Sequence, residues 1–126
     1  MNVIHTPTAA TPAGHYAQAI GHAGTLYISG QLPVSADGRH NLSAPFAEQV
    51  RLALANLLAI LTAAGGKPED LVKVTVYVVG VQHWPAFDQV YAAALGEHRP
   101  ARAVVPVPEL HHGYQVEIEA VARYLA

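Results

Sequence analysis

The sequence predicts an α+β fold in which a mixed sheet carries two helices on one of its faces. Residues 43–64 place apolar side chains three and four positions apart, the spacing of a helix with one buried face. Residues 71–79 alternate between apolar and polar side chains, as a strand does when one face of its sheet is buried. The strand predicted over residues 114–124 alternates in the same way, which indicates that the helices cover one face of the sheet only.

Length and composition fit one domain that spans residues 1–126. Hydrophobic residues make up 52% of the chain and charged residues 13%, whereas ordinary soluble domains carry about 25% charged residues. A surface so short of charge is typical of a chain that buries part of it in an oligomer. The formal net charge is −2 and the seven Lys and Arg residues are scattered, so the sequence lacks the clustered basic footprint of nucleic-acid binding.

The chain contains no cysteine, which excludes disulfides, thiolate nucleophiles and thiolate metal ligands. Residues 1–11 lack a basic segment followed by an apolar stretch, so we expect no signal peptide. No run approaches the roughly 20 apolar residues of a membrane span. The longest candidate, residues 52–64, contains Asn56 and Thr62 and has helical periodicity. We therefore expect a cytoplasmic protein that does not enter a membrane.

The N-terminal third is predicted to hold two strands. Residues 1–15 are rich in Thr, Pro and Ala and are expected to be extended. One strand is predicted over residues 16–22 and the next over residues 25–29, which alternate apolar and mixed positions. Residues 21–24, with Gly at both ends, predict the turn between them.

The helix over residues 43–64 has signals for its start and its end. Ser43 can cap its first turn, and Pro45 stands where a missing N–H costs nothing. Gly65 and Gly66 end it. Its apolar stripe consists of Phe46, Val50, Leu54, Leu57, Leu58 and Leu61.

The second half of the chain adds three strands and one helix. In the strand over residues 71–79, one face is expected to carry Val72, Val74, Val76 and Val78, and the other Lys73, Thr75 and Tyr77. A helix is predicted over residues 85–95, ended by Gly96. Strands over residues 101–107 and 114–124 complete the order β-β-α-β-α-β-β, and Pro106 marks the former as an edge strand or a bulge.

The last predicted strand has one apolar and one polar face. The apolar face consists of Val116, Ile118, Ala120 and Ala122, and the polar face of Gln115, Glu117, Glu119 and Arg123. Two carboxylates, those of Glu117 and Glu119, therefore project from the same side of the sheet. A face of this kind must meet water, a partner or a ligand.

Four segments occur in a recognisable order. They are Gly14-His15-Tyr16-Ala17-Gln18, Ser29-Gly30-Gln31-Leu32-Pro33-Val34, Pro100-Ala101-Arg102 and Val116-Glu117-Ile118-Glu119-Ala120-Val121-Ala122. Together they resemble the YjgF/RidA family over nearly the whole chain. The combination of the Ser-Gly-Gln-x-Pro turn with the spacing from Pro-Ala-Arg to Glu-Ile-Glu-Ala is what makes the resemblance specific.

This resemblance implies a chorismate-mutase-like single domain that assembles as a homotrimer with ligand sites between subunits. It also implies an enamine/imine deaminase, which hydrolyses reactive 2-imino acids of the 2-aminoacrylate type to 2-keto acids and ammonia without a cofactor. The partners would then be small 2-imino and 2-keto carboxylates, with neither a nucleic acid nor a membrane involved.

The resemblance assigns roles to six residues. Arg102 matches the arginine that grips the substrate carboxylate, a role that suits a permanently charged, bidentate guanidinium. Glu117 matches the glutamate that holds the attacking water, because hydrolysis of a C=N bond needs proton transfer in both of its steps. The other substrate-binding positions are Tyr16, Ser29, Gly30 and Val104, and at Gly30 the missing side chain permits close backbone approach.

Two features depart from the family pattern. The best-known members carry a cysteine where this chain has Val104, so the backbone N–H is kept and the thiol is lost. The loop of residues 106–113 also differs from the founding subgroup, which places substrate identity in question more than reaction type. These departures motivate an alternative function: a non-catalytic trimer that binds small carboxylates or regulates a partner. A ribonuclease activity has also been attached to this family, and the lack of a basic groove argues against it here.

The remaining polar and aromatic candidates have structural interpretations. We expect Glu119 to form a structural ion pair with Lys73. Adjacent histidines on a strand face opposite ways, so His111 and His112 are not expected to form a metal site. Trp84 and Phe87 are expected to belong to the core or an interface.

Overall fold

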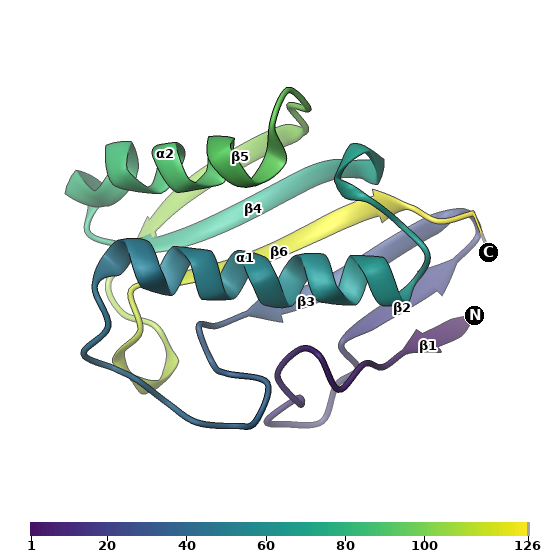
Figure 1. The fold of residues 1–126 in the computed structure, drawn as a ribbon, viewed down its shortest axis with the longest axis horizontal. Helices are drawn as coiled ribbons and strands as arrows, with labels where there is room; N and C mark the ends of the chain where they lie inside the picture. The colour runs from purple at the N-terminus through teal and green to yellow at the C-terminus, as the bar shows by residue number, and fades with distance from the viewer. Residues whose placement is uncertain (126) are drawn as a thin grey trace.

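The computed structural model describes residues 1–125 and contains one six-stranded sheet with both helices on the same face (Figure 1). The strands are β1 (Asn2–Ile4), β2 (Ala19–His22), β3 (Thr25–Gln31), β4 (Leu71–Val79), β5 (Ala101–Val107) and β6 (Val116–Arg123). The helices are α1 (Phe46–Ala63) and α2 (Trp84–Leu95), with single turns at η1 (Pro68–Asp70), η2 (Val81–His83) and η3 (His111–Gly113). The order across the sheet is β1-β2-β3-β6-β4-β5, and only β4 and β5 run parallel. The predicted α+β class with a mixed sheet is therefore confirmed.

The core lies between the helices and the sheet. From α1, the stripe residues Val50, Leu54, Leu57 and Leu61 are buried, and Phe46 and Leu58 are partly buried against them. Among residues 1–125, α1 is the one helix that is long and apolar enough, by length and composition, to cross a membrane. Its buried stripe packs on β6 and β3 instead, as the core helix of a soluble domain does.

The N-terminal segment differs from the prediction. Residues 2–4 form β1, which pairs with β2 from Asn2 opposite Gly21 to Ile4 opposite Ala19. The strand predicted over residues 16–22 begins only at Ala19, and Tyr16 lies outside it, half exposed. A three-residue strand has too short a pattern to be recognised in the sequence, because what defines it is its pairing with a distant segment.

The predicted cap of α1 is also wrong. The Ser43 hydroxyl donates to Asn41 Oδ1, and Pro45 is the residue that precedes the first helical turn. The Pro45 carbonyl accepts the N–H of Gln49, so the helix starts two residues later than it would with Ser43 as its cap.

Strand β4 has the predicted bounds but not the predicted face at its start. The pairing of β4 with β6 shifts between Leu71 and Lys73, so Val72 is an extra residue in a bulge. Val72 is 55% exposed, whereas Val74 is fully buried. The expectation that all four valines share one face therefore fails at Val72 and holds for Val74, Val76 and Val78. Strand β5 is an edge strand, as Pro106 predicted.

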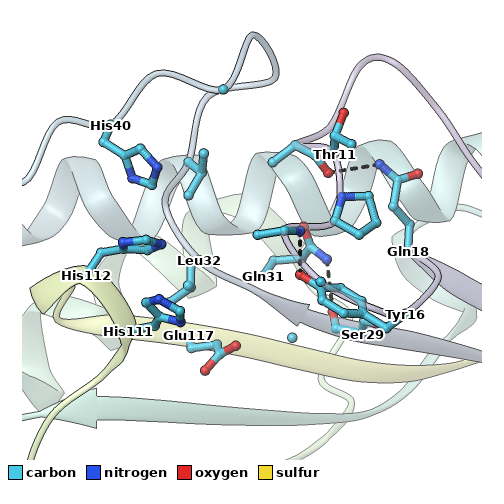
Figure 2. Close-up of a pocket in the computed structure, with 17 residues that line it drawn as sticks. Thr11, Tyr16, Gln18, Ser29, Gln31, Leu32, His40, His111, His112 and Glu117 are labelled. Atoms are coloured by element: carbon cyan, nitrogen blue, oxygen red, sulfur yellow. Dashed lines mark hydrogen bonds between the residues drawn. The ribbon is translucent and has the colours of Figure 1, made fainter.

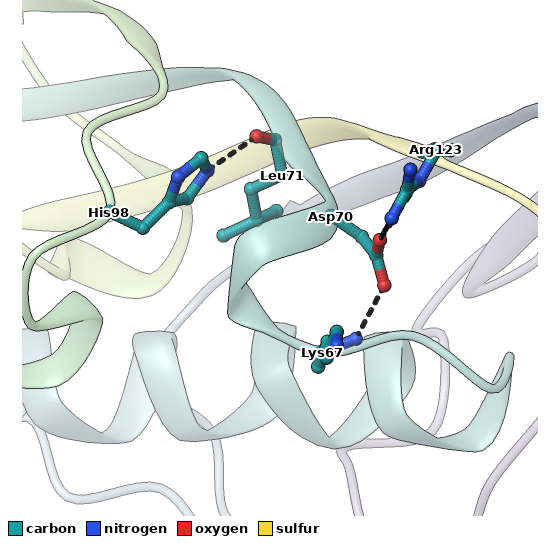
Figure 3. Close-up of polar contacts among 5 residues, drawn as sticks. All are labelled: Lys67, Asp70, Leu71, His98 and Arg123. Carbon is teal, nitrogen blue, oxygen red and sulfur yellow. Dashed lines mark hydrogen bonds and ion pairs between the residues drawn. The ribbon is translucent and has the colours of Figure 1, made fainter.

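A polar clasp joins the start of β4 to the end of β6 (Figure 3). Asp70 Oδ1 accepts hydrogen bonds from Nε and Nη2 of Arg123 at 3.0 and 2.6 Å, and Asp70 Oδ2 accepts the Lys67 backbone N–H at 3.0 Å. A ring nitrogen of His98 lies 2.8 Å from the Leu71 carbonyl oxygen next to this clasp. The hydrogen bonds from Arg123, followed by that from Lys67, hold the pKa of Asp70 below its ordinary value.

The clasp predicts a pH-dependent contribution to stability. Because the pKa of Asp70 is lowered in the folded state, its carboxylate stabilises the fold above the ordinary pKa of an aspartate, and the contribution disappears as the pH falls through the folded-state pKa. We expect Asp70→Asn to lower the melting temperature by several degrees at pH 7 and by progressively less as the pH falls below about 4. Asp37→Asn is the control, since the Asp37–Arg39 pair is 51% and 85% exposed. Equal losses for both variants at pH 7 would contradict the assignment.

Candidate functional site

The face of the sheet opposite the helices carries Glu117 and Glu119, as predicted. Glu119 is exposed, and its Oε1 accepts a hydrogen bond from the Tyr77 hydroxyl at 3.3 Å. The predicted ion pair between Glu119 and Lys73 is not among the four ion pairs of residues 1–125, so that expectation was wrong. Lys73 lies opposite Val121 in the sheet, two positions along β6 from Glu119.

Glu117 lies at one end of a cavity of about 730 Å³. Three parts of the chain form its walls: residues 10–18, residues 29–40 and the η3 turn. Figure 2 shows Glu117 with His111 above it at one end of the cavity, and Tyr16 and Ser29 toward the other. The cavity thus brings together four of the six predicted site residues, namely Tyr16, Ser29, Gly30 and Glu117.

A β-bulge shapes this end of the cavity. Strands β3 and β6 pair through Ile28 opposite Ala120 and then again through Gln31 opposite Ile118. One extra residue therefore lies on β3 at Ser29 and Gly30, where bulges commonly redirect side chains near active sites. A Cβ at position 30 would lie 2.6 Å from Oε2 of Glu117, so a larger residue here would have to push the carboxylate aside. The carboxylate therefore rests directly against the backbone of Gly30.

Two hydroxyl groups of the cavity are fixed by local hydrogen bonds. The Ser29 hydroxyl donates to the Ala17 carbonyl oxygen at 2.6 Å, which leaves its oxygen to accept from a ligand. The Tyr16 hydroxyl accepts the Ala13 backbone N–H at 3.3 Å, which leaves its own proton to donate. Towards a bound molecule, Ser29 can therefore act as a hydrogen-bond acceptor and Tyr16 as a hydrogen-bond donor.

The half-buried Glu117 has an unusual environment for a carboxylate. Burial, and then the nearby charge of Glu119, raise its pKa above the ordinary value, while His111 opposes the rise. A carboxyl whose pKa moves toward neutral pH is better matched to taking up and releasing a proton during a reaction. The geometry of Glu117 is thus that of a group that can hold and activate a water molecule.

Arg102 and Val104 lie elsewhere in the chain. They stand on edge strand β5 opposite Val74 and Val76 of β4, which places their side chains on the helix-covered face. Arg102 Nη1 donates to Asp88 Oδ1 at 2.8 Å, and the guanidinium lies 4.9 Å from the ring centre of Tyr91. Val104 packs against the core. One chain therefore does not bring Arg102 and Glu117 together.

Gln18 and Gln31 have supporting roles that were not predicted from the sequence. Gln18 is buried and donates to the carbonyl oxygens of Thr6 and Ala10, while its own oxygen accepts the Thr6 N–H. These bonds fix the wall formed by residues 10–18. Gln31 donates to the Ser29 carbonyl oxygen at 3.1 Å. Both glutamines belong to the motif segments, and this position was the only feature of the sequence that pointed to them. Their spacing does not distinguish a buried glutamine that supports the site from an exposed one.

Three histidines also line the cavity, and only two of them were singled out from the sequence. His40 comes from the loop before α1, and His111 and His112 from η3. The expectation that His111 and His112 face opposite ways was wrong, because they stand in a turn and their rings stack 3.9 Å apart. No group of three His, Asp or Glu side chains suited to a metal ion occurs in the part of the chain that the structure describes.

The two aromatic residues of α2 have different environments. Phe87 is fully buried and belongs to the core, as expected. Trp84 is 43% exposed and lies beside Arg102, whose guanidinium carbon is 5.5 Å from the centre of its ring.

Comparisons with known proteins agree on one group of relatives. Residues 6–124 match the model of the family described as Endoribonuclease L-PSP. The chain is 39% identical to a RutC family protein of Pyrococcus horikoshii over 95% of both chains. It is 36% identical to the human 2-iminobutanoate/2-iminopropanoate deaminase, over 95% of this chain and 88% of that one. A crystal structure of Escherichia coli TdcF with bound serine superimposes with a TM-score of 0.93 at 32% identity, over 99% of this chain and 100% of that one.

Proposed function

Because the chain belongs to the Endoribonuclease L-PSP family, that is, the YjgF/RidA family, we propose that it is a cytoplasmic, cofactor-independent hydrolase that converts reactive 2-imino acids to 2-keto acids and ammonia. The observation that carries the proposal is the half-buried Glu117 carboxylate held against the Gly30 backbone inside the cavity. The human relative, named as a deaminase of 2-iminobutanoate and 2-iminopropanoate, supports the same chemistry.

Hydrolysis of an imine needs one group that transfers a proton in each of its two steps. The carboxylate of Glu117 takes a proton from water as the water oxygen bonds to the imine carbon, and the protonated Glu117 gives this proton to the imine nitrogen, which yields a neutral carbinolamine. The Glu117 carboxylate then takes the carbinolamine hydroxyl proton and passes it to the amino nitrogen. The C=O bond forms as the C–N bond breaks, ammonia leaves, and Glu117 is ionised again. Tyr16 and Ser29 supply one donor and one acceptor to orient the substrate.

We propose further that the site is completed by Arg102 of a second copy in a homotrimer. In one chain Arg102 and Glu117 lie on opposite faces of the sheet, and the face that carries Glu117 is uncovered by helices. Exposed apolar side chains stand on that face, including Tyr27 at 52% and Val105 at 37% exposure. With only 13% charged residues the chain has little else to cover such a surface. Sedimentation that gives a monomer at micromolar concentration would contradict this arrangement.

The contact between Gly30 and Glu117 can be tested by adding one methyl group. Gly30 does not have a positive φ, so alanine fits its backbone, but the new Cβ collides with the carboxylate. We expect Gly30→Ala to keep its melting temperature within a few degrees and to lower kcat/KM by about tenfold or more, since a misplaced catalytic group loses much of its effect. Gly14→Ala is the matched control, because its Cβ would meet Tyr16 at an ordinary 3.5 Å. A fully active Gly30→Ala variant would show that Glu117 is not used where it lies.

The activity itself is tested in a coupled assay. An amino acid oxidase generates 2-imino acids from a panel of amino acids, and semicarbazide competes with the protein for the imine. We expect the wild-type protein to slow semicarbazone formation and the Glu117→Gln variant not to do so. An unchanged rate across the panel would remove the deaminase from consideration.

One observation favours a second candidate function, a non-catalytic module that binds small carboxylates. The crystal structure of the TdcF relative contains bound serine, an amino acid rather than an imine. This candidate predicts keto-acid binding by calorimetry without turnover of any imine, and turnover that depends on Glu117 would rule it out. Ribonuclease activity is disfavoured because, among the described residues, the cavity is lined by neither Lys nor Arg.

A further inference from the structure

A stack of aromatic rings forms one end of the cavity. The rings of His111 and His112 lie 3.9 Å apart, those of His112 and His40 4.5 Å apart, and His40 Nδ1 is 2.7 Å from the Tyr114 hydroxyl oxygen. Tyr114 is fully buried, so it ties the outer rings to the core. The stack therefore fixes the position of the η3 turn against the loop before α1.

This stack places His111 over Glu117. The turn η3 is stabilised by Gly113 N–H donating to the Leu110 carbonyl oxygen, and His112 has a φ of 65°, which folds the chain back over the cavity. Figure 2 shows the His111 ring above and to the left of the Glu117 side chain, with the rings of His112 and then His40 farther above it. Both His111 and Glu117 line the cavity.

The other groups that face Glu117 work against its ionisation or carry no charge. Glu119 stands two residues along β6, and Tyr77 lies directly opposite on β4. The bulge of β3 offers only Ser29 and Gly30, and the N-terminal wall offers the neutral phenol of Tyr16. Burial and Glu119 raise the pKa of Glu117, and the one opposing influence comes from His111.

We propose that His111 is a positioning residue for Glu117: its imidazolium, held over the cavity by the rings of His112 and His40, keeps the carboxylate ionised as the solution becomes acidic. This inference rests on the proposed function, since it matters only if the Glu117 carboxylate is the reacting base. An ordinary imidazole gains its proton near pH 6.5, which is above the range in which a carboxyl does.

His111 and His112 differ in how they affect Glu117, although their rings are stacked on each other. Burial, followed by the charges of His111 and His40, lowers the pKa of His112. His112 consequently stays neutral to lower pH than an ordinary histidine and acts on His111 chiefly through ring packing. The control is therefore a histidine outside the stack: His22 is exposed at the end of β2 and is not among the residues that line the cavity.

The proposal is tested by measuring the titration of Glu117 directly. Full-length protein labelled with ¹³C at the glutamate carboxyl carbons is titrated by NMR, and the Glu117 signal is assigned by its loss in Glu117→Gln. We expect His111→Gln to move the titration midpoint upward by about 0.5 pH unit, the size expected for one unit charge a few ångströms away in a water-like dielectric. His22→Gln should leave it unchanged, and His111→Lys should return it to or below the wild-type value.

The pH profile of kcat/KM supplies the second readout. We expect the acid limb of the His111→Gln profile to shift upward together with the NMR midpoint, whatever the height of its plateau. An unmoved midpoint, or equal shifts for His111→Gln and His22→Gln, would overturn the proposal. The absence of any turnover in the wild type would overturn the proposed function instead, and the NMR titration would still decide whether His111 controls the ionisation of Glu117.

Discussion

Arg102→Ala is expected to lower kcat/KM for 2-imino acids by about 10²-fold or more. Two hydrogen bonds from a guanidinium to a carboxylate at ~1.5 kcal/mol each account for that loss at tenfold per 1.4 kcal/mol. The guanidinium is held ready by its bond to Asp88 at 2.8 Å and by the Tyr91 ring below it, and its side chain is 21% exposed. A substrate carboxylate would compete with Asp88 for this group.

Two further variants separate geometry from charge. Arg102→Lys keeps the positive charge but loses the fork, so we expect it to recover little of the lost activity. Arg99→Ala is the matched control, because Arg99 is exposed and lines the same small cavity as Arg102 on the helix side of the sheet. Wild-type kinetics for Arg102→Ala in an active enzyme would remove Arg102 from the site.

Mixing the two inactive chains tests whether the site is shared between subunits. A site built from two copies takes Arg102 from one chain and Glu117 from another, so a trimer that contains Arg102→Ala and Glu117→Gln chains regains some intact sites. Random pairing in a cyclic assembly makes about one site in four intact. Co-expressed variants should therefore show close to a quarter of wild-type activity. No recovery from verified mixed trimers would show that Arg102 and Glu117 do not act across an interface.

Glu117→Gln is expected to lower kcat by about 10²–10⁴-fold, the usual contribution of a general acid or base. Glutamine keeps the shape of the side chain and its contact with Gly30 but cannot accept a proton. Glu119→Gln is the matched control: it stands on the same face of β6, is exposed, and should change kcat only a few-fold at pH 7. A larger loss for Glu119→Gln than for Glu117→Gln would exchange the roles of the two carboxylates.

The same substitution should make the protein more stable at neutral pH. Burial and Glu119 raise the pKa of Glu117 in the folded state, so folding favours the protonated form and the carboxylate destabilises the fold at pH 7. Glutamine removes this charge, and we expect a higher melting temperature for Glu117→Gln at pH 7. The difference should disappear below about pH 4, where the glutamate is protonated in the folded and the unfolded chain alike.

The fold was predictable where a pattern is long enough to be recognised. The nine residues of β4 alternate clearly, and α1 and α2 have strong stop signals in Gly65 and Gly96. β1 was not predictable, because its three residues form a strand only through their pairing with β2. The outward position of Val72 was also hidden, since a bulge depends on the register with a distant strand and leaves no trace in the alternation.

The candidate site was predictable through its motif segments and not through its spatial arrangement. The sequence placed Glu117 on a polar strand face, and the structure adds that Gly30 crowds it from a bulge. It placed Arg102 on a strand but gave no sign of the partner Asp88 or of the helix-covered face. The stacking of His111 on His112 depends on the left-handed conformation of His112 in η3. Two adjacent histidines in a sequence do not predict such a conformation.

The two ends of the sheet constrain how copies of this chain can associate. One border is the three-residue β1, too short to template a long ladder, and the other is β5, where Pro106 has no N–H to offer. Pairing of the edge strands of successive copies would produce open-ended fibres. Both edge strands are poorly suited to such pairing. Contact through the broad uncovered surface of the sheet has no such obstacle and can close on itself after a few copies. The positions of one proline and one short strand thus disfavour open-ended growth by strand addition.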